Sequence, residues 1–365
     1  MTLPVYSVYA LLVLSAITIS GTHFAQSDAV PTPTVQVFVI AGGDGDTLLR
    51  VDPIAGTETR VVVNGTDYSI VDNAVVYFDR PTRRVRVLSA DGAARDHPFM
   101  QMPERARRID WTASADRLAW TVTRGDDGAL ITDTFIAAAD GRSTRLILTD
   151  GPRDGIRAYP VAFTPDNAAL LMDYQPDAIG DITPLRQYAG LFALDLETGM
   201  TTALPGEPGC FCGAGFGAGW FLRLTLAEGD FAARAFFLAP GSAGAAVAGA
   251  AETMLTPIDT DRYIQGGGFV VSPDGRRAIY ALVRLGALVG SGIPDETLLV
   301  SIDLTDGAQR PSASTIEGLL RPVAWADADS VLLTDRAGST WKWRIDSDDL
   351  ARIAQGAYIG TIGYN

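Results

Sequence analysis

The sequence predicts an all-β fold, a seven-bladed β-propeller made of four-stranded antiparallel blades. Two observations support this prediction. A hairpin pattern, in which an apolar run meets a tight turn and a second apolar run follows, recurs along most of the chain at a nearly constant interval. A second, weaker hairpin follows each first one and gives an independent count of seven. Two antiparallel hairpins per repeat are what one propeller blade requires.

The clearest first hairpin covers 269–283, with the turn Ser-Pro-Asp-Gly at 272–275. In such a turn proline presets φ, aspartate bonds its own backbone and glycine accepts a positive φ. Thr112, Thr164 and Ala326 hold the place of the turn serine in other copies. The intervals are 52 residues between the two threonines, 108 from the second threonine to the serine, and 54 from the serine to the alanine. Since 108 is twice 54, the spacing predicts a hidden copy near residue 218.

The hidden copy is the turn Gly-Ala-Gly at 217–219, followed by an apolar strand at 220–226. In the second hairpins, an apolar strand mostly ends in Asp or Ala, and turn residues containing Gly lead to a weaker outer strand. The seven second hairpins cover 48–63, 85–99, 134–148, 191–204, 235–249, 298–311 and 341–354.

Blade one lacks an inner strand in sequence order. One strand is predicted at 37–41 and two more in the hairpin at 48–63, with nothing strand-like before them. The segment 357–364, AYIGTIGY, follows the last hairpin and predicts one strand more than blade seven needs. We expect it to complete blade one, with Ile359 beside Phe38, because closure removes open sheet edges. The other blades are predicted at 68–99, 109–148, 161–204, 213–250, 267–314 and 322–354.

Three segments, SPDGRRAIY, TPDNAALLM and LDLETGMTTAL, resemble the TolB-type repeat, which is WD40-like. The resemblance covers most of 36–365. It implies a β-propeller in an exported bacterial protein that binds a protein or another component of the cell envelope. Because propellers host unrelated activities, the resemblance does not assign a function by itself.

Residues 1–27 carry no charged side chain and include a largely apolar run, which indicates a secretory signal peptide cleaved after Ala25. The alternative is an uncleaved N-terminal membrane anchor, since the run approaches the roughly 20 apolar residues that a spanning helix needs. Both interpretations predict export, to the periplasm, the cell surface or the medium. Residues 28–35 are predicted to be a Pro/Thr spacer and 36–365 the propeller.

The formal net charge of the 365-residue chain is −14 at pH 7. Phosphate binding needs clustered Lys and Arg, so this charge argues against nucleic acid or an anionic membrane as a partner. Membrane contact is expected only through 1–27, if that segment stays uncleaved. We expect a monomer.

The alternation of antiparallel strands decides where the loops lie. If the strands of each blade are a, b, c and d, the b-to-c and d-to-a connections share one face of the ring. The long segments 173–190 and 284–297 are b-to-c connections, and 205–213 and 250–265 are d-to-a connections. We call their shared face the long-loop face and expect ligands to bind there. The candidates for ligand contact are Asp126, Asp173, Asp181, Arg186, Asp295 and Glu296.

The sequence offers little for a metal centre or a catalytic triad. His97 is the sole histidine outside the leader, and we expect it at the surface, in an outer strand. No cofactor is predicted. Calcium is the alternative, either at the acidic turn 42–48 or at Asp173, Asp177 and Asp181, whose four-residue spacing lies in an irregular loop.

Cys210 and Cys212 are the two cysteines of the chain. Exported compartments oxidise thiols, so one prediction is a small, strained disulfide between them. Two partly buried thiols are the alternative. No thioredoxin-like context accompanies the pair, which favours a structural role over a redox role.

Two main functions compete on these grounds. The favoured one is non-catalytic binding of a protein or a surface polymer through the long-loop face. The alternative is a calcium-assisted or carboxylate-based hydrolase or lyase at the channel mouth, which requires paired carboxylates at a definite separation. A structural envelope protein that keeps its N-terminal helix in the membrane is a third hypothesis.

Overall fold

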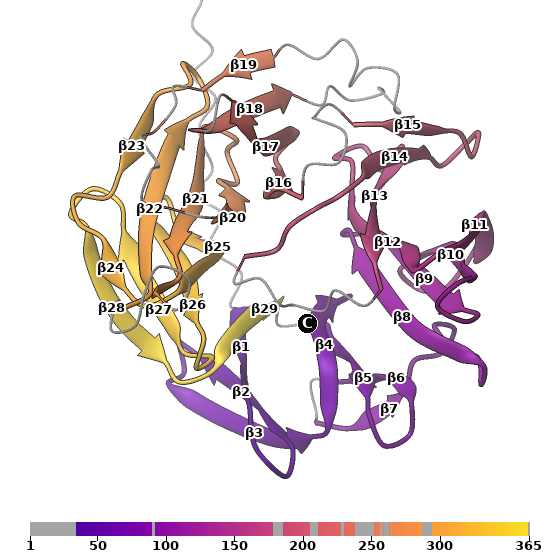
Figure 1. Ribbon diagram of the computed structural model, residues 1–365. Helices are drawn as coiled ribbons and strands as arrows, with labels where there is room; N and C mark the ends of the chain where they lie inside the picture. Colours follow the sequence, from indigo (N-terminus) through magenta and orange to yellow (C-terminus); the bar gives the residue numbers. More distant parts are fainter. Residues whose placement is uncertain are drawn as a thin grey trace, which may run out of the picture.

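The computed structural model shows a ring of antiparallel β-sheets (Figure 1). The described residues form seven sheets, each with its strands in order from the centre of the ring to its rim, which confirms the predicted seven-bladed propeller. Within this described part, no helix is long and apolar enough to cross a membrane. The predicted leader at 1–27 lies outside it. The structure describes residues 34–89, 92–177, 185–204, 211–227, 230–237, 252–255, 258, 263, 265–286 and 294–363.

Blades one to four each contain four strands, and the last strand of the chain is the innermost strand of blade one. From the centre outwards, blade one is β29 (Ala357–Gly363), β1 (Thr34–Ile40), β2 (Asp46–Asp52) and β3 (Thr57–Val63); blade two is β4 (Gly65–Val71), β5 (Ala74–Asp79), β6 (Arg84–Leu88) and β7 (Ala94–Asp96); blade three is β8 (Ala106–Ala113), β9 (Arg117–Arg124), β10 (Leu130–Ala138) and β11 (Arg145–Arg153); blade four is β12 (Ile156–Phe163), β13 (Ala169–Pro176), β14 (Leu191–Asp195) and β15 (Thr201–Ala203).

Blades five to seven follow the same order. Blade five is β16 (Ala214–Gly217), β17 (Trp220–Ala227), β18 (Asp230–Phe237) and β19 (Glu252–Met254); blade six is β20 (Gln265–Val271), β21 (Arg277–Arg284), β22 (Glu296–Asp303) and β23 (Gln309–Pro311), with the short β24 (Ile316–Glu317) also paired to β22; blade seven is β25 (Leu320–Asp327), β26 (Ser330–Asp335), β27 (Thr340–Arg344) and β28 (Asp349–Ala354).

The outer strand of blade five differs from the prediction. It begins at Glu252, beyond the predicted end of that blade at Ala250. The preceding sequence, 239–251, consists mainly of Ala and Gly, which carry no alternating apolar pattern. Without such a pattern the sequence could not place this strand.

The last segment of the chain closes the ring, as predicted, by pairing β29 with β1. A register shift between Val37 and Phe38 puts Tyr358, rather than Ile359, opposite Phe38. The predicted pairing of Ile359 with Phe38 is therefore wrong, because the irregularity displaces it, and Ile359 lines the central cavity instead. β1 begins at Thr34, within the predicted spacer.

Turn chemistry fixes the repeated inner hairpin. The Ser272 hydroxyl donates to Asp274 at 2.6 Å and accepts the Arg277 amide at 2.9 Å, while Gly275 has φ +70°. Thr164 makes the corresponding contacts in blade four, at 2.8 and 2.9 Å. A turn held in this way sets the register of the two strands that it joins.

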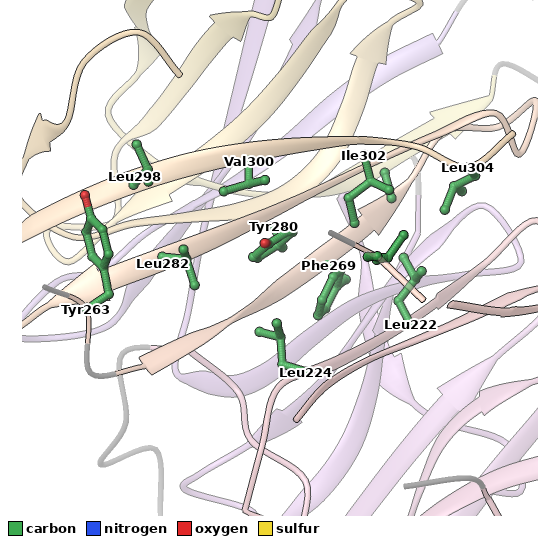
Figure 2. Close-up of a cluster of buried hydrophobic side chains, with 12 residues drawn as sticks. Leu222, Leu224, Tyr263, Phe269, Tyr280, Leu282, Leu298, Val300, Ile302 and Leu304 are labelled. Atoms are coloured by element: carbon green, nitrogen blue, oxygen red, sulfur yellow. The ribbon is translucent and has the colours of Figure 1, made fainter. Parts of the chain in front are cut away.

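The hydrophobic core is divided among the spaces between neighbouring blades. Figure 2 shows the cluster between blades five and six, where Leu222 and Leu224 of β17 lie against Phe269, Tyr280 and Leu282. The rings of Phe269 and Tyr280 stack with their centroids 4.9 Å apart. Similar clusters join blades one and two, two and three, three and four, four and five, and six and seven. This close packing makes the blades a rigid scaffold for the loops.

His97 is buried, so the prediction of a surface histidine is wrong. It follows β7 and is 4% exposed, with its ring edge-on to Phe99 at 4.6 Å. Its Nδ1 accepts the Met100 amide at 3.1 Å. Phe99 and Met100 belong to the core between blades two and three, and the chain turns inward here to reach it. Burial lowers the pKa of His97 to about 4.

Hydrogen bonds between connections confirm that b-to-c and d-to-a loops share a face. The Asp177 amide, at the start of the b-to-c connection of blade four, donates to Gly155 in the d-to-a connection before it at 2.8 Å. The Gly318 amide donates to Asp295 in the same manner at blade six, at 2.7 Å. Much of the four long segments, including 178–184, 205–210 and 287–293, lies outside the described residues.

Candidate ligand-binding channel

A cavity of about 800 Å³ lies at the centre of the ring. Its walls come from the innermost strands β4, β8, β12, β25 and β29, which surround the centre in Figure 1. Residues 185–187 and Arg336, both in b-to-c connections, also line it, so it extends to the long-loop face. A volume of this size is typical of small-molecule sites.

The cavity lining is rich in arginine although the whole chain is acidic. The chain carries a net charge of −14, whereas the charged residues of the lining are five arginines and three aspartates. Low-dielectric walls focus such a local excess of positive charge and attract anions. The charged lining residues are Arg108, Arg157, Arg186, Arg321 and Arg336, with Asp67, Asp110 and Asp335.

Asp110 neutralises part of this positive charge within the wall. Its carboxylate lies 2.9 Å from Arg108 and 2.7 Å from Arg157. The side chain of Arg157 is only 3% exposed and also lies 3.2 Å from Asp177, which pairs with Arg107 at 3.2 Å. A buried charge requires such partners. Arg157 and Asp110 therefore build the wall, and their charges largely satisfy each other.

The chain that leads into β14 reaches across the centre of the ring. We call residues 185–190 the crossing segment; in Figure 1 it runs inward from blade four towards β20 and β25. Leu185 packs into the core between blades six and seven, and its amide donates to the Gln265 side chain at 3.2 Å. The Gln187 side chain donates to the Gly266 carbonyl at 3.0 Å. These contacts hold the far end of the segment on blade six.

Blade five holds the middle of the crossing segment. Tyr188 and Cys212 exchange two backbone hydrogen bonds, at 2.9 and 3.1 Å. The guanidinium of Arg223, which is 3% exposed, donates to the carbonyl of Tyr188 at 3.1 Å and to that of Cys212 at 2.9 Å. Hydrogen bonds from a charged donor are stronger than neutral ones, so this contact stiffens the segment.

Asp173, a predicted ligand contact, holds the near end of the crossing segment. It is fully buried and accepts the Gly190 amide at 2.7 Å, the Ala189 amide at 3.2 Å and the Tyr159 hydroxyl at 3.2 Å. Burial raises the pKa of Asp173, and the amide donors oppose that rise. Because it lies behind the cavity wall, Asp173 is placed to orient the segment rather than to touch a ligand.

Arg186 is the residue of the crossing segment that projects into the cavity. Its neighbours on either side are buried, whereas Arg186 is exposed to the solvent of the cavity. Its guanidinium carbon lies 4.9 Å from the ring centroid of Tyr159 and 5.4 Å from that of Tyr188. No described carboxylate makes an ion pair with it, and Asp110 and Asp173 act on it from farther away. Two aromatic rings thus hold a guanidinium that makes no direct ion pair within the described residues.

Arg321 of β25 brings a second guanidinium of this kind. It is exposed, lines the cavity, and within the described part of the chain its side chain makes no ion pair or hydrogen bond. A Cβ placed on Gly268 would lie 3.5 Å from Arg321 Cγ and 3.6 Å from Leu185 Cδ2, so Arg321 lies next to the crossing segment. Two like charges in one cavity repel each other, and a bound anion would relieve this repulsion.

The other described candidates do not line the cavity. Asp295 pairs with Arg336 at 3.3 Å, and Glu296 pairs with Arg284 at 2.5 Å. Asp126 is exposed in the turn between β9 and β10. Of the described candidates, the structure therefore brings Arg186 alone into the cavity.

The carboxylates suggested for calcium have other partners. Asp173 accepts amides, and Asp177 pairs with Arg157 and Arg107. In the acidic turn, Asp46 accepts the Tyr68 hydroxyl at 2.6 Å. Within the described ranges, no group of His, Cys, Asp or Glu side chains could hold a metal ion.

Two of the predicted site residues, Asp181 and Cys210, lie outside the described residues. Cys212 is disulfide-bonded, and no described cysteine is free. Its backbone pairs with the crossing segment, which is consistent with a structural role for this region.

The sequence interpretation missed the charged residues of the innermost strands. Arg108, Arg157 and Arg321 are each the second or third residue of their strand, and Asp67 is the third residue of β4. The available signal was a charge near the start of an innermost strand. Such a strand borders the channel of a propeller, and its start lies at the long-loop face, so a charge there points to the channel mouth.

Comparison with solved structures agrees on the fold. A chain from a structural and mechanistic study of two prolyl endopeptidases has a TM-score of 0.58 at 11% identity, over 88% of this chain and 50% of its own length. A protein from Lactobacillus plantarum has a TM-score of 0.54 at 13% identity, over 92% of this chain and 100% of its own. The chain thus spans half the length of the endopeptidase chain. At such identities these similarities show the propeller fold alone.

No protein-family model and no curated protein matches the sequence. The TolB-type resemblance therefore stays a prediction.

Proposed function

We propose that this protein is a non-catalytic binding protein that takes an anionic group of its ligand into the central cavity from the long-loop face. The observation that carries the proposal is Arg186, a guanidinium that the crossing segment presents to the cavity without a carboxylate partner. Arg321 adds a second one. A guanidinium held in place loses little further freedom when it binds a carboxylate or phosphate through two hydrogen bonds.

The proposed partner is a protein or polymer of the cell envelope, and the proposed location is outside the cytoplasm. The leader-like residues 1–27 and the TolB-type resemblance support this choice. The net charge of −14 repels acidic polymers elsewhere on the surface. Binding of such a polymer would therefore be confined to the arginine-rich channel.

Catalysis has less support than binding. A carboxylate-based hydrolase or lyase needs two carboxylates that face the substrate at a definite separation. Among the aspartates of the lining, Asp110 is paired with two arginines, and Asp335 accepts the Ser339 amide and the Trp341 indole, each at 2.8 Å. Only Asp67 of these three makes no hydrogen bond or ion pair within the described residues. A single such carboxylate supplies no pair.

Acidic polymers test the proposal directly. Alginate, an acidic polysaccharide, and poly-L-glutamate, an acidic polypeptide, would be titrated into the full chain, with dextran as the neutral polymer. We expect at least one acidic polymer to bind and dextran not to bind. The double variant Arg186→Gln/Arg321→Gln should weaken that binding about tenfold or more, which corresponds to about 1.4 kcal/mol.

Arg142→Gln is the control for overall charge and is compared with the single variant Arg186→Gln, because each removes one positive charge; Arg142 lies in a turn on the opposite face, where its side chain is 83% exposed. It should bind like the parent protein. Equal losses in both variants would assign the effect to net charge and not to the channel. Failure of both acidic polymers to bind the parent protein would overturn the proposal.

A further inference from the structure

We infer that the cavity recognises a hydroxycarboxylate: a carboxylate held by Arg186 and Arg321, with neighbouring hydroxyl groups that donate to the aspartates of the wall. This inference rests on the proposed function and adds the chemistry of the ligand. The observation behind it is that guanidinium and carboxylate groups face the same cavity, so a ligand must satisfy both.

The two arginines select a singly charged, planar anion. A carboxylate matches the fork of a guanidinium and forms two parallel hydrogen bonds with it. A phosphate would bring a second negative charge towards Asp67, Asp110 and Asp335, which line the same cavity. A carboxylate brings one charge, which the excess positive charge of the lining can balance.

The aspartates select hydrogen-bond donors. Asp67 is exposed, and its φ of +55° lies in an irregular stretch of β4 that begins at Thr66. Asp335 is partly exposed in blade seven, at the end of β26. An ionised carboxylate only accepts hydrogen bonds, so a ligand group beside it must donate. A hydroxyl donates without adding positive charge, whereas an ammonium would be repelled by the excess arginines.

The crossing segment makes this recognition selective, because it fixes the position of Arg186. Blade six holds Gln187, blade five holds Tyr188, and Asp173 holds Gly190. A guanidinium fixed in this way cannot follow a ligand around the cavity. The ligand carboxylate must come to it, and the hydroxyl groups are then placed by the carbon skeleton.

Three six-carbon probes separate the two requirements. D-gluconate carries a carboxylate and hydroxyl groups, hexanoate carries the carboxylate only, and sorbitol carries hydroxyl groups only. Calorimetric titration of the full chain should give D-gluconate an affinity about tenfold or more above that of either relative. Equal binding of hexanoate would overturn the role of the hydroxyl groups. Equal binding of sorbitol, or tighter binding of inorganic phosphate, would overturn the role of the carboxylate.

Two substitutions assign the roles to residues. Arg186→Gln should remove most of the D-gluconate binding, and Asp67→Asn should reduce its advantage over hexanoate. Asparagine tolerates a positive φ, so the second change preserves the local backbone. Arg142→Gln should bind all probes like the parent protein. A variant at Asp67 that keeps the full preference for D-gluconate would contradict the assignment.

The outcomes distinguish this inference from the proposed function. If the acidic polymers bind but D-gluconate has no advantage over hexanoate, the inference fails and the proposed function stands. If D-gluconate binds as expected but neither polymer binds, the site takes a free small acid, and the proposed polymeric partner is wrong. If no probe binds, both fail.

Discussion

The spaces between the blades and the channel at the centre are lined by the same sheets, but their chemistry is opposite. Between blades five and six, Phe269 and Tyr280 pack among leucines, and the cluster holds no charged side chain (Figure 2). In the channel, Arg186 and Arg321 are exposed and keep charges that no described carboxylate pairs with. The first region is complete without a ligand, whereas the second is not.

This difference separates the residues that stabilise the ring from those available for recognition. Apolar burial between blades supplies the favourable free energy of folding. Charged groups in a solvent-filled channel contribute little to it, and arginines that repel each other oppose it. Substitutions should therefore be costly between the blades and inexpensive in the channel, and the following changes test that division.

Loss of β29 should have the largest effect. Deleting 357–365 removes β29, the innermost strand of blade one. This exposes the edge of β1 that pairs with β29 in the ring. We expect aggregation or the loss of cooperative unfolding, because an open strand edge is a template for association. Size-exclusion chromatography and thermal unfolding measure both. A truncated chain that melts cooperatively at the Tm of the parent would contradict closure by β29.

Ile279→Asp should cost several kcal/mol, about 4 or more, because it places an unpaired carboxylate in the core between blades six and seven. Ile279 is 0% exposed. Urea denaturation would measure the change in the free energy of unfolding. Val62→Asp is the matched control, since Val62 is 73% exposed and the same charge there should be nearly neutral. Similar losses of unfolding free energy in the two variants would show that Ile279 is not part of the core.

Arg223→Gln should cost about 3 kcal/mol, because it leaves the buried carbonyls of Tyr188 and Cys212 without their charged donor. The same denaturation experiment would measure it. The change should also loosen the crossing segment, so that amide exchange at Tyr188 becomes faster. If stability falls while exchange at Tyr188 is unchanged, Arg223 stabilises blade five without holding the segment.

His97 gives the core between blades two and three a pH dependence. Its pKa falls from 6.5 to about 4 on folding because burial disfavours the charged ring. The unfolded chain therefore binds the proton more readily, and stability is lost as the pH falls from 6.5 towards 4. Between pH 8 and pH 5 the loss is roughly 2 kcal/mol. His97→Gln should lack this component, and parallel pH profiles for parent and variant would contradict it.

The sequence could predict the blades because each blade is a local, repeated pattern. The turn at Ser272 and its copy at Thr164 identify the inner hairpins, because the residues that form each turn are close together in the chain. The contacts that build the channel could not be predicted from such local patterns. The pairing of Asp110 with Arg157 joins two blades, and the hold of Arg223 on Tyr188 joins blade five to a loop of blade four.

His97 shows the same limit from another side. Its predicted place in an outer strand favours exposure, and only the inward turn of Phe99 and Met100 into the core between blades two and three explains its burial. Contacts of this kind depend on how non-adjacent segments meet, so no local pattern encodes them. Arg186 could be named from the sequence as a residue of a long loop, but its presentation by blades five and six could not.

Arg186→Gln should have the smallest effect on stability and is therefore the sharpest test of the division. Arg186 and Arg223 both belong to the region of the crossing segment, but Arg223 is 3% exposed and satisfies two carbonyls, whereas Arg186 is exposed to the cavity and has no described ion pair. We expect a change within about 0.5 kcal/mol in the free energy of unfolding. A loss close to that of Arg223→Gln would mean that Arg186 serves the fold, since a residue kept for recognition can be removed without weakening the ring that presents it.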